Sequence, residues 1–300
     1  MKKIRFLNID YSMLSSYLGR SATVLVFSVI VLLAIGALYF KHDDMAHLPI
    51  SLGICAFDSA RSHSTLESLA DYVRERGGGD IALRFFTEGD TPSDCDFYLM
   101  TSLQYSRAHT EPGLECCCIA TVRQKQKYSR GVIVTRPGID SLALSRASVI
   151  FTSPHSTVGY LSPLKALSEA APQLPNGHRH IAFAGGELDY ERVVFGVLFE
   201  GYGAGGISLE RYQYLLRRGV VSEDELEVIL EGDALPAFVL AVDPDIDSLK
   251  RRGFQTRLVE ICDRMPAALR YDLERLGMSG FATPSENDLE LLETLTSYLH

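Results

Sequence analysis

Residues 147–163 read ASVIFTSPHSTVGYLSP, a stretch in which an apolar strand, a polar turn and a helix start follow one another. The apolar run 147–152 predicts a strand, and a helix is expected to begin near Ser156. The first amides of that helix have no partner within it, so they could bind an anion together with the helix dipole and the hydroxyls of Ser156 and Thr157. The same hydroxyls could instead only cap the helix, and the residues leave both interpretations open.

Strands and helices alternate on both sides of this stretch. Apolar runs predict strands at 49–56, 81–86, 96–100, 131–134, 147–152, 180–184, within 193–199 and at 237–242. Helices are predicted at 64–76, 209–217, 248–264, 266–276 and 286–298. The alternation predicts an α/β fold with parallel-rich sheets, in which ligands bind beyond the carboxyl ends of strands.

The turn after residue 152 resembles the signature of a known family. Pro154-x-Ser156-Thr157-x-Gly159-Tyr160-Leu161-x-Pro163 is similar to the P-x-S-T-S-G-[YF]-L-x-P motif of the phosphate, phosphite and phosphonate substrate-binding proteins of ABC importers. This is the PhnD-type family, which has a type II periplasmic-binding fold. Other segments resemble family segments in the same order: Asp96-Phe97-Tyr98 with Ser102-x-x-Tyr105-x-x-Ala108, Tyr128-x-x-x-Val132-Ile133-Val134, Ala184-Gly185-Gly186-Glu187 and Leu276-Gly277-Met278-Ser279-Gly280-Phe281. The resemblance therefore spans about residues 49–283.

The resemblance implies a ligand site made of Ser156, Thr157, Val158, Tyr128, Glu187 and Tyr105. The hydroxyls of Ser156 and Thr157 and the amides around Val158 would hold the phosphonate group. Tyr128 would contact it from the hinge side, and Glu187 would face the organic end of the ligand. Neither a cofactor nor a metal is implied.

Several departures from the family pattern bear on the ligand. Val158 stands where the family usually has a third hydroxyl, and Gly186 where it often has histidine. The acidic residue of a later G-x-x-D segment is missing at 201–206, and the short stretch 86–96 lacks an aromatic residue of the family. Loss of an acid and an aromatic should weaken recognition of an amino-phosphonate, which leaves a smaller anion, or no transported ligand, as alternatives.

An uncharged apolar run of 19 residues, 22–40, follows the basic N-terminus. As a helix it would span roughly 28 Å, close to the hydrocarbon core of about 30 Å. Basic residues precede the run and Asp43 and Asp44 follow it, so the positive-inside rule places the N-terminus in the cytoplasm and the main domain outside the inner membrane. A signal peptide cleaved after Ala34-Ile35-Gly36 is the alternative, although this leading stretch and apolar run are longer than a signal peptide needs.

The expected organisation follows from these patterns. It is a cytoplasmic tail (1–21), a single transmembrane helix (22–40), a linker (41–48) and a periplasmic binding domain (49–300). Within the domain, lobe 1 is expected at about 49–135 and 240–300 and lobe 2 at about 140–236, with hinge strands near 132–135 and 237–242.

Charge excludes a basic nucleic-acid binder. The chain has 29 Lys+Arg against 38 Asp+Glu, a net charge of −9. Residues 1–21 carry four basic side chains and one acidic, so the remainder carries −12 and offers no cationic face to phosphates of nucleic acid. An acidic domain repels anions at long range, so the groups at 156–158 would have to supply the local attraction.

No set of residues predicts an enzyme. There is no G-x-S-x-G turn to expose a nucleophile. Gly201-x-Gly203-x-x-Gly206 fits a dinucleotide fingerprint, but nicotinamide cofactors are not expected outside the membrane, and we interpret these glycines as allowing close strand–helix packing. Of the six cysteines, the three at 116–118 would alternate sides on a strand and cannot all face one metal. Buried free thiols are therefore expected, with a disulfide as the alternative.

The leading hypothesis is a membrane-anchored binding protein whose lobes close over a small oxyanion docked at Ser156. A membrane permease or a signalling protein would read the closure. The alternative is a degenerate relative that acts as a sensory or interaction module without a transported ligand, which the missing acid and the anchor favour.

Overall fold

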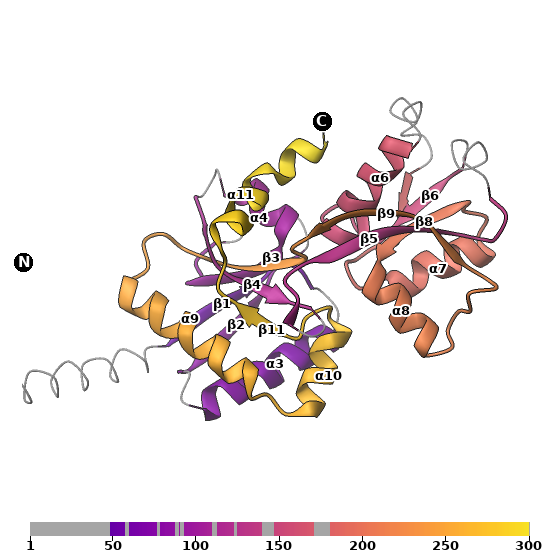
Figure 1. Ribbon diagram of the computed structural model, residues 1–300. Coiled ribbons are helices and arrows are strands. Elements are labelled where there is room, and N and C mark those ends of the chain that lie inside the picture. Colours follow the sequence, from indigo (N-terminus) through magenta and orange to yellow (C-terminus); the bar gives the residue numbers. More distant parts are fainter. Residues whose placement is uncertain are drawn as a thin grey trace, which may run out of the picture. The chain divides into compact units, whose positions relative to one another are not determined.

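A computed structural model describes residues 49–57, 60–76, 79–87, 90, 93–109, 113–122, 125–139, 147–170 and 181–299. The predicted tail, transmembrane helix and linker (1–48) lie outside the described residues. Within these ranges, no helix has the length and apolar character needed to cross a membrane. The described chain forms two lobes, each built on one mixed sheet (Figure 1).

Lobe 1 contains a six-stranded sheet in the order β11-β4-β10-β3-β1-β2. The strands are β1 (Ile50–Ile54), β2 (Ile81–Phe85), β3 (Phe97–Thr101), β4 (Glu115–Thr121), β10 (Phe238–Val242) and β11 (Gly280–Ala282). β1 pairs in parallel with β2 and β3, whereas β10 lies antiparallel between β3 and β4, and β11 pairs antiparallel with β4. The C-terminal part of the chain thus returns to complete the lobe that the N-terminal strands begin.

Helices cover both faces of this sheet. Those on one face are α3 (Ala60–Glu75), α9 (Ser248–Asp263) and α10 (Ala267–Arg275). Those on the other are α4 (Ser102–Ala108) and α11 (Glu286–Thr294), which a 3-10 turn (Leu295–Leu299) follows. Because both faces are covered, the central strands are apolar on both sides, and β3 and β10 are buried along their whole length.

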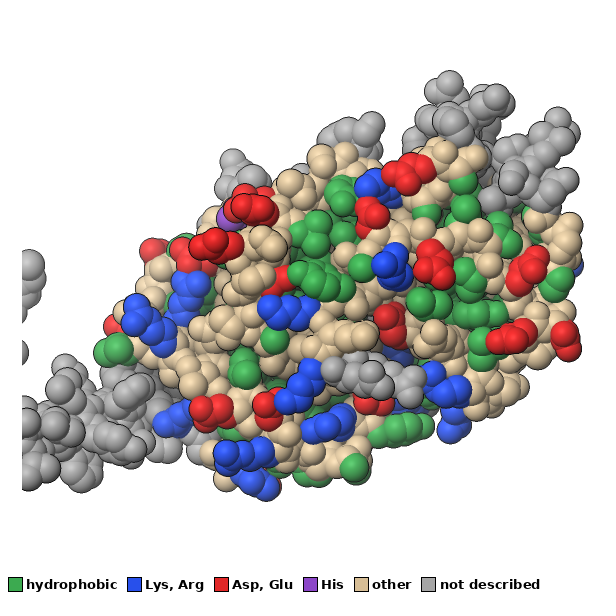
Figure 2. Space-filling view, in the orientation of Figure 1, with side chains coloured by type: hydrophobic (Ala, Val, Ile, Leu, Met, Phe, Trp, Pro, Cys, Tyr) green, Lys and Arg blue, Asp and Glu red, His purple; other side chains and the backbone are tan. Residues whose placement is uncertain are grey.

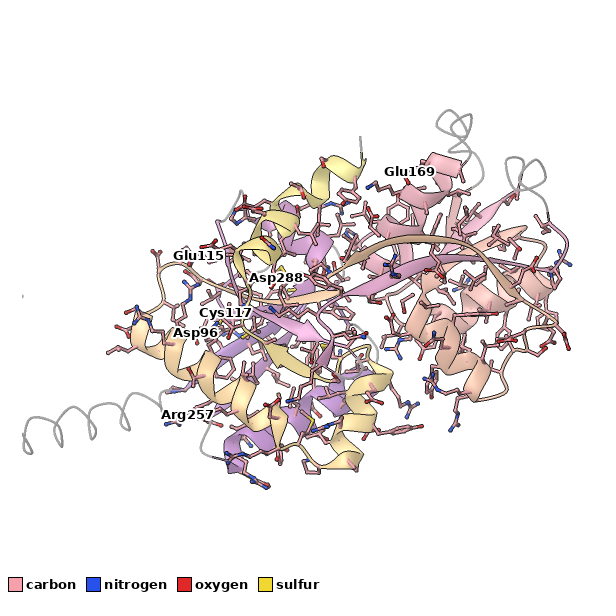
Figure 3. All side chains as sticks on the ribbon, viewed as in Figure 1. Asp96, Glu115, Cys117, Glu169, Arg257 and Asp288 are labelled. Atoms are coloured by element: carbon pink, nitrogen blue, oxygen red, sulfur yellow. The ribbon has the colours of Figure 1, made fainter. Side chains whose placement is uncertain are left out.

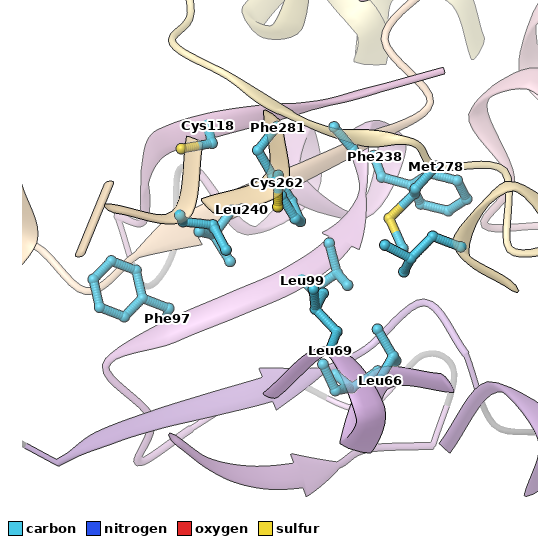
Figure 4. Close-up of a cluster of buried hydrophobic side chains, with 14 of the residues drawn as sticks. Leu66, Leu69, Phe97, Leu99, Cys118, Phe238, Leu240, Cys262, Met278 and Phe281 are labelled. Carbon is cyan, nitrogen blue, oxygen red and sulfur yellow. The ribbon is translucent and has the colours of Figure 1, made fainter. Parts of the chain in front are cut away.

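Two cores result, one on each face of the sheet. Along β3, Phe97 and Leu99 join the core under α3 and α9, and Tyr98 and Met100 join the core under α4 and α11. This division follows the period-two alternation of side chains along a strand. Figure 4 shows part of the first core, including Leu99 of β3, Leu66 and Leu69 of α3 and Cys262 of α9.

All six cysteines are buried and free, which confirms the expectation of buried thiols. The pairing of β4 with β10 shifts register so that Leu240 opposes Cys118 and Ala241 opposes Cys116. Cys117 is the extra residue of this β-bulge, and it joins the same core as Cys118, while Cys116 joins the other. Among the described residues, no group of three or more His, Cys, Asp or Glu side chains could hold a metal ion.

Lobe 2 contains a five-stranded sheet in the order β7-β6-β8-β5-β9. The strands are β5 (Ser129–Thr135), β6 (Val149–Phe151), β7 (Ile181–Phe183), β8 (Ala204–Ser208) and β9 (Glu227–Leu235). β6 is parallel to β7 and β8, and β5 is antiparallel to β8 and β9. α7 (Tyr190–Phe199) and α8 (Leu209–Arg217) contribute to the core on one face, and α6 (Ser162–Ala170) contributes to the core on the other.

Among the described residues, the chain passes from lobe 1 to lobe 2 between β4 and β5, by way of 125–128, and returns between β9 and β10 at Pro236-Ala237. The first crossing differs from the expected boundary at residue 135. β5 contains the expected hinge segment 132–135, but it pairs with β8 and β9 and so belongs to the sheet of lobe 2. Residues before β5 make the crossing because the apolar strand is fully used in the lobe 2 core.

One predicted strand is wrong, and the other predicted strands and helices are present. Residues 193–199 lie in the helix α7, where Val193, Val194 and Val197 are buried while Phe199 is exposed. Gly201 and Gly203 lie between α7 and β8, and Gly206 lies within β8, so the fingerprint is not the strand-to-helix turn that binds phosphate. A Cβ on Gly205 would come within 2.7 Å of Val193 in α7, and one on Gly206 within 3.2 Å of Pro163 in α6. Close strand–helix packing therefore holds for Gly206 as predicted, whereas a Cβ on Gly201 would meet no atom within 4 Å.

Candidate ligand-binding site

The turn after β6 starts a helix, as the sequence predicts. A π-helical turn (Thr157–Leu161) leads into α6, and Ser156 caps it by accepting a hydrogen bond from the Gly159 amide at 2.7 Å. Gly159 is required here, since a Cβ would lie 2.2 Å from Thr152 Oγ1 and 2.8 Å from Ser156 Oγ. Ser156 therefore has the capping role that was one of its two interpretations.

Two hydrogen bonds between a side chain and the backbone join this turn to lobe 1. Thr157 Oγ1 accepts from the Leu103 amide at 2.9 Å, and Thr101 Oγ1 donates to the His155 carbonyl at 2.6 Å. Leu103 lies in the first turn of α4, where backbone amides have no helical partner. The side chain of one lobe thus satisfies a free amide of the other, and both Ser156 and Thr157 are fully buried.

His155 strengthens the same contact. Arg107 Nη1 of lobe 1 lies 3.1 Å from His155 Nδ1. Burial, together with the positive charge of Arg107, lowers the pKa of His155 below its ordinary value, so the neutral ring can accept a hydrogen bond from the guanidinium.

A cavity of about 300 Å³ lies between the lobes next to this contact. Lobe 2 lines it with Ser129 of β5 and with residues from the segments 152–159, 187–190 and 208–218. Val122, Ala237, Phe238 and residues within 271–278 complete the lining. Its charged lining consists of four arginines and three glutamates. On the face drawn in Figure 2, acidic and basic side chains are also interspersed.

The cavity brings together two of the six predicted site residues, Val158 and Glu187. The helix start thus reaches the wall through Val158 and Gly159, while the hydroxyls of Ser156 and Thr157 are engaged in the hydrogen bonds described above. Val158 offers the cavity an apolar side chain at the position where the family usually has a third hydroxyl.

The two predicted tyrosines lie outside the cavity lining. Tyr128, in the first crossing, donates a hydrogen bond to Asp288 of α11, and this bond is the main cause that raises the pKa of Tyr128 to about 12 (Asp288 is marked in Figure 3). Tyr105 is buried in lobe 1, where its hydroxyl oxygen lies 3.3 Å from His109 Nδ1 and burial raises its pKa.

Arg211 is a cavity residue that the sequence patterns do not single out. It belongs to the first turn of α8 and is only 7% exposed. Its guanidinium carbon lies 4.7 Å from the ring centroid of Tyr190, a cation–π arrangement. In sequence it is one of several basic residues of a predicted helix, and only its burial distinguishes it.

Glu210 supplies an acidic group close to the segment 201–206, where the acid of the family's G-x-x-D motif is missing. It lines the cavity and accepts a hydrogen bond from Ser129, the first residue of β5. The carboxylate comes from α8, the helix after β8, so it does not stand at the distance from glycine that the family motif requires.

A family model described as the periplasmic substrate-binding protein of the phosphonate ABC transporter matches residues 54–289. No curated protein matches the sequence. Among solved structures, a Xanthomonas citri protein bound to ATP is 17% identical, with a TM-score of 0.62 and coverage of 84% of this chain and 96% of that one. PhnD1 from Prochlorococcus marinus, in complex with methylphosphonate, is 11% identical, with a TM-score of 0.61 and coverage of 84% and 98%.

A binding-protein component of an ABC phosphonate transporter from Pseudomonas aeruginosa is 16% identical, with a TM-score of 0.63 and coverage of 83% of this chain and 85% of that one. At these identities the likeness shows the fold, which is the two-lobed α/β fold that the sequence predicts. The family model covers most of the chain, and it describes transport binding proteins and not enzymes. The chain therefore belongs to the family of periplasmic substrate-binding proteins of phosphonate ABC transporters.

Proposed function

We propose that this protein is a membrane-anchored extracytoplasmic binding protein that captures a small phosphorus oxyanion, either phosphate, phosphite or a phosphonate, and delivers it to an ABC permease. The observation that carries the proposal is the cavity of about 300 Å³ that both lobes line, with the family-motif segment 152–159 on its wall. A cavity that two lobes share can couple ligand binding to lobe closure, which a membrane partner can read.

The six residues that the family resemblance implies remain the proposed ligand set, with Val158 and Glu187 on the cavity wall. Ser156 and Thr157 accept hydrogen bonds through their oxygens, so each hydroxyl proton is available to a bound anion. Reaching them requires the lobes to part, because Thr157 contacts the Leu103 amide directly. An anion bound there would separate Thr157 from the Leu103 amide and would itself bridge the two lobes.

Calorimetry and thermal unfolding with phosphate, phosphite and methylphosphonate test the function, with sulfate as the comparison anion. A ligand present at 100 times its Kd should stabilise the protein by about 2.7 kcal/mol. Ser156→Ala and Thr157→Ala should weaken binding, whereas Ser168→Ala, which removes an exposed hydroxyl on α6 that bonds only the Leu164 carbonyl, should not. Absence of stabilisation by all three phosphorus anions would overturn the proposed ligand class.

A sensory or interaction module is the second candidate, and the engaged hydroxyls favour it. The contact of Thr157 with Leu103 and of Thr101 with His155 closes the lobes on each other through the protein's own groups. In that case the protein would bind a signalling partner with none of the anions present. Pull-down of a permease from membranes in an anion-dependent manner would contradict this candidate.

Anchoring through residues 22–40 is part of the proposal. The basis is the uncharged run of 19 residues after a basic N-terminus. Membrane fractionation and the mass of the mature protein test it. Retention in the membrane at full length is expected, and release of a protein that begins after Gly36 would show cleavage.

A further inference from the structure

The interlobe cavity contains one arginine that is enclosed by protein. Of the four arginines in its lining, Arg217 and Arg218 are exposed and Arg275 is half-buried, whereas Arg211 is 7% exposed. A guanidinium stays protonated in proteins, so Arg211 places a permanent positive charge inside the cavity. The carboxylates of Glu187 and Glu210 line the same cavity and interact electrostatically with Arg211. Arg211 Nη2 still has no hydrogen-bond partner among the described residues, so one guanidinium donor is left for a ligand.

Arg211 extends from lobe 2 to lobe 1. Its backbone amide is bound by the α8 cap, Ser208, and its guanidinium stacks on Tyr190 of lobe 2. On the lobe 1 side, a Cβ at Gly277 would lie 3.1 Å from Nη2, and Gly277 has a φ of +87° that a side chain would strain. A glycine at this position therefore leaves room for the guanidinium between the lobes.

Two buried polar atoms on the cavity lining have no hydrogen-bond partner among the described residues. They are Arg211 Nη2 and Thr152 Oγ1. An unmade hydrogen bond of a buried group costs about 1–3 kcal/mol, and more for a charged group, so native proteins rarely keep such groups without a use. Both atoms can donate a hydrogen bond, so together they fit a ligand head that accepts hydrogen bonds, and the charge of the guanidinium favours a negatively charged head.

Apart from Ser129 and Ser208, the remaining side chains of the lining are aromatic or apolar. Tyr190 and Tyr214 of lobe 2 and Phe238, Tyr271 and Met278 of lobe 1 surround the space beside the charged groups. The volume of about 300 Å³ equals that of roughly ten water molecules at about 30 Å³ each. A tetrahedral oxyanion alone would leave most of this space to water, whereas a ligand with an apolar or aromatic substituent would fill it.

We propose that Arg211 pairs with the anionic head of the ligand, with Thr152 as a second donor, and that the ligand is an organic phosphonate or phosphate monoester with an aryl or similarly bulky apolar substituent. The inference rests on the proposed function, because it uses the same cavity, and it restricts the ligand to phosphorus oxyanions with a bulky apolar substituent. In this proposal the main electrostatic attraction for the ligand comes from the Arg211 guanidinium on α8 and not from the helix start at Ser156.

Isothermal titration calorimetry with phenylphosphonate, methylphosphonate and benzenesulfonate tests the proposal. Phenylphosphonate should bind the wild-type protein at least tenfold more tightly than methylphosphonate. Arg211→Gln should weaken phenylphosphonate binding about 10- to 100-fold, since hydrogen bonds to charged groups are strong. The matched control is Arg252→Gln, which removes an exposed guanidinium of α9 outside the cavity lining and should change affinity less than twofold.

Thr152→Val keeps the side-chain shape and removes only the unpartnered hydroxyl, so it tests the site even where Arg211→Gln folds poorly. It should weaken phenylphosphonate binding about 5- to 10-fold. Equal affinity of the Arg211→Gln and Arg252→Gln proteins, no preference for the phenyl compound, or no binding of any probe would each overturn the inference.

The three probes also separate this inference from the proposed function. Binding of methylphosphonate that Arg211→Gln leaves unchanged would overturn the role of Arg211 while the phosphorus-oxyanion function stands. Binding of benzenesulfonate that requires Arg211, with neither phosphonate bound, would support the role of Arg211 in an anion site and overturn the assignment of a phosphonate as the ligand.

Discussion

Gly159 belongs to the family motif, and the packing of the fold also requires that this residue has no side chain. A Cβ there would lie 2.2 Å from Thr152 Oγ1, one of the two unpartnered cavity atoms, and 2.8 Å from the capping oxygen of Ser156. The glycine therefore allows the turn to approach β6 closely. The sequence places Gly159 in a motif, and the structure supplies the steric reason for it.

Gly159→Ala should destabilise the protein by about 1–3 kcal/mol, because the added methyl group displaces both hydroxyls. Urea unfolding measures the effect. The control is Gly253→Ala in α9, where a Cβ meets no atom within 4 Å, and which should stabilise the protein by about 0.5–1 kcal/mol through helix propensity. Equal effects of the two substitutions would contradict the steric account.

The start of α11 shows how one element ties the C-terminus to the first crossing. Asp288 belongs to a capping box with Ser285 and also accepts hydrogen bonds from Lys127 Nζ at 2.7 Å and from Tyr128. Burial would raise the pKa of Asp288, but the hydrogen bonds from Lys127, the Ser285 amide and Tyr128 outweigh it and lower the pKa from 3.8 to about 2. The carboxylate is thus stabilised in its charged form.

A folded-state pKa below the unfolded value means that Asp288 contributes stability above about pH 4 and loses it as the pH falls toward 2. The shift corresponds to about 2 kcal/mol. Asp288→Asn should therefore lower the free energy of unfolding by about that amount at pH 7 and by little near pH 2. Denaturant unfolding at both pH values measures this difference, and a loss that does not depend on pH would contradict the electrostatic account.

Element type is predictable where the apolar pattern has a clear period, and α7 shows where it does not. Helix 209–217 is predicted with its observed bounds, because its polar and apolar positions alternate at helical spacing. Residues 193–199 read VVFGVLF, which is apolar throughout, and such a run fits a buried strand or a buried helix equally well. These residues form a helix in the structure, because Val193, Val194 and Val197 pack in the core against the lobe 2 sheet.

For the whole molecule, the contact between the lobes at Thr157 is the feature most open to test. Thr157→Val should leave the buried Leu103 amide without an acceptor and weaken the interlobe contact by about 1–3 kcal/mol. Hydrogen exchange at the Leu103 amide should become at least roughly tenfold faster. Ser168→Ala serves as the control, and unchanged protection of Leu103 in the Thr157→Val protein would show that the contact does not hold the lobes together.

The sequence by itself determines the α/β class, most of the elements and the helix start at Ser156, because these depend on local periodicity and on residues next to one another in the chain. The tertiary structure alone decides that β5 belongs to lobe 2, that 193–199 is helical, and that Arg211, Thr152 and Gly277 meet at one cavity. Those residues lie more than fifty positions apart and on different elements. Which of the chain's many arginines is enclosed depends on how two sheets and their helices come together, and no local pattern encodes that arrangement.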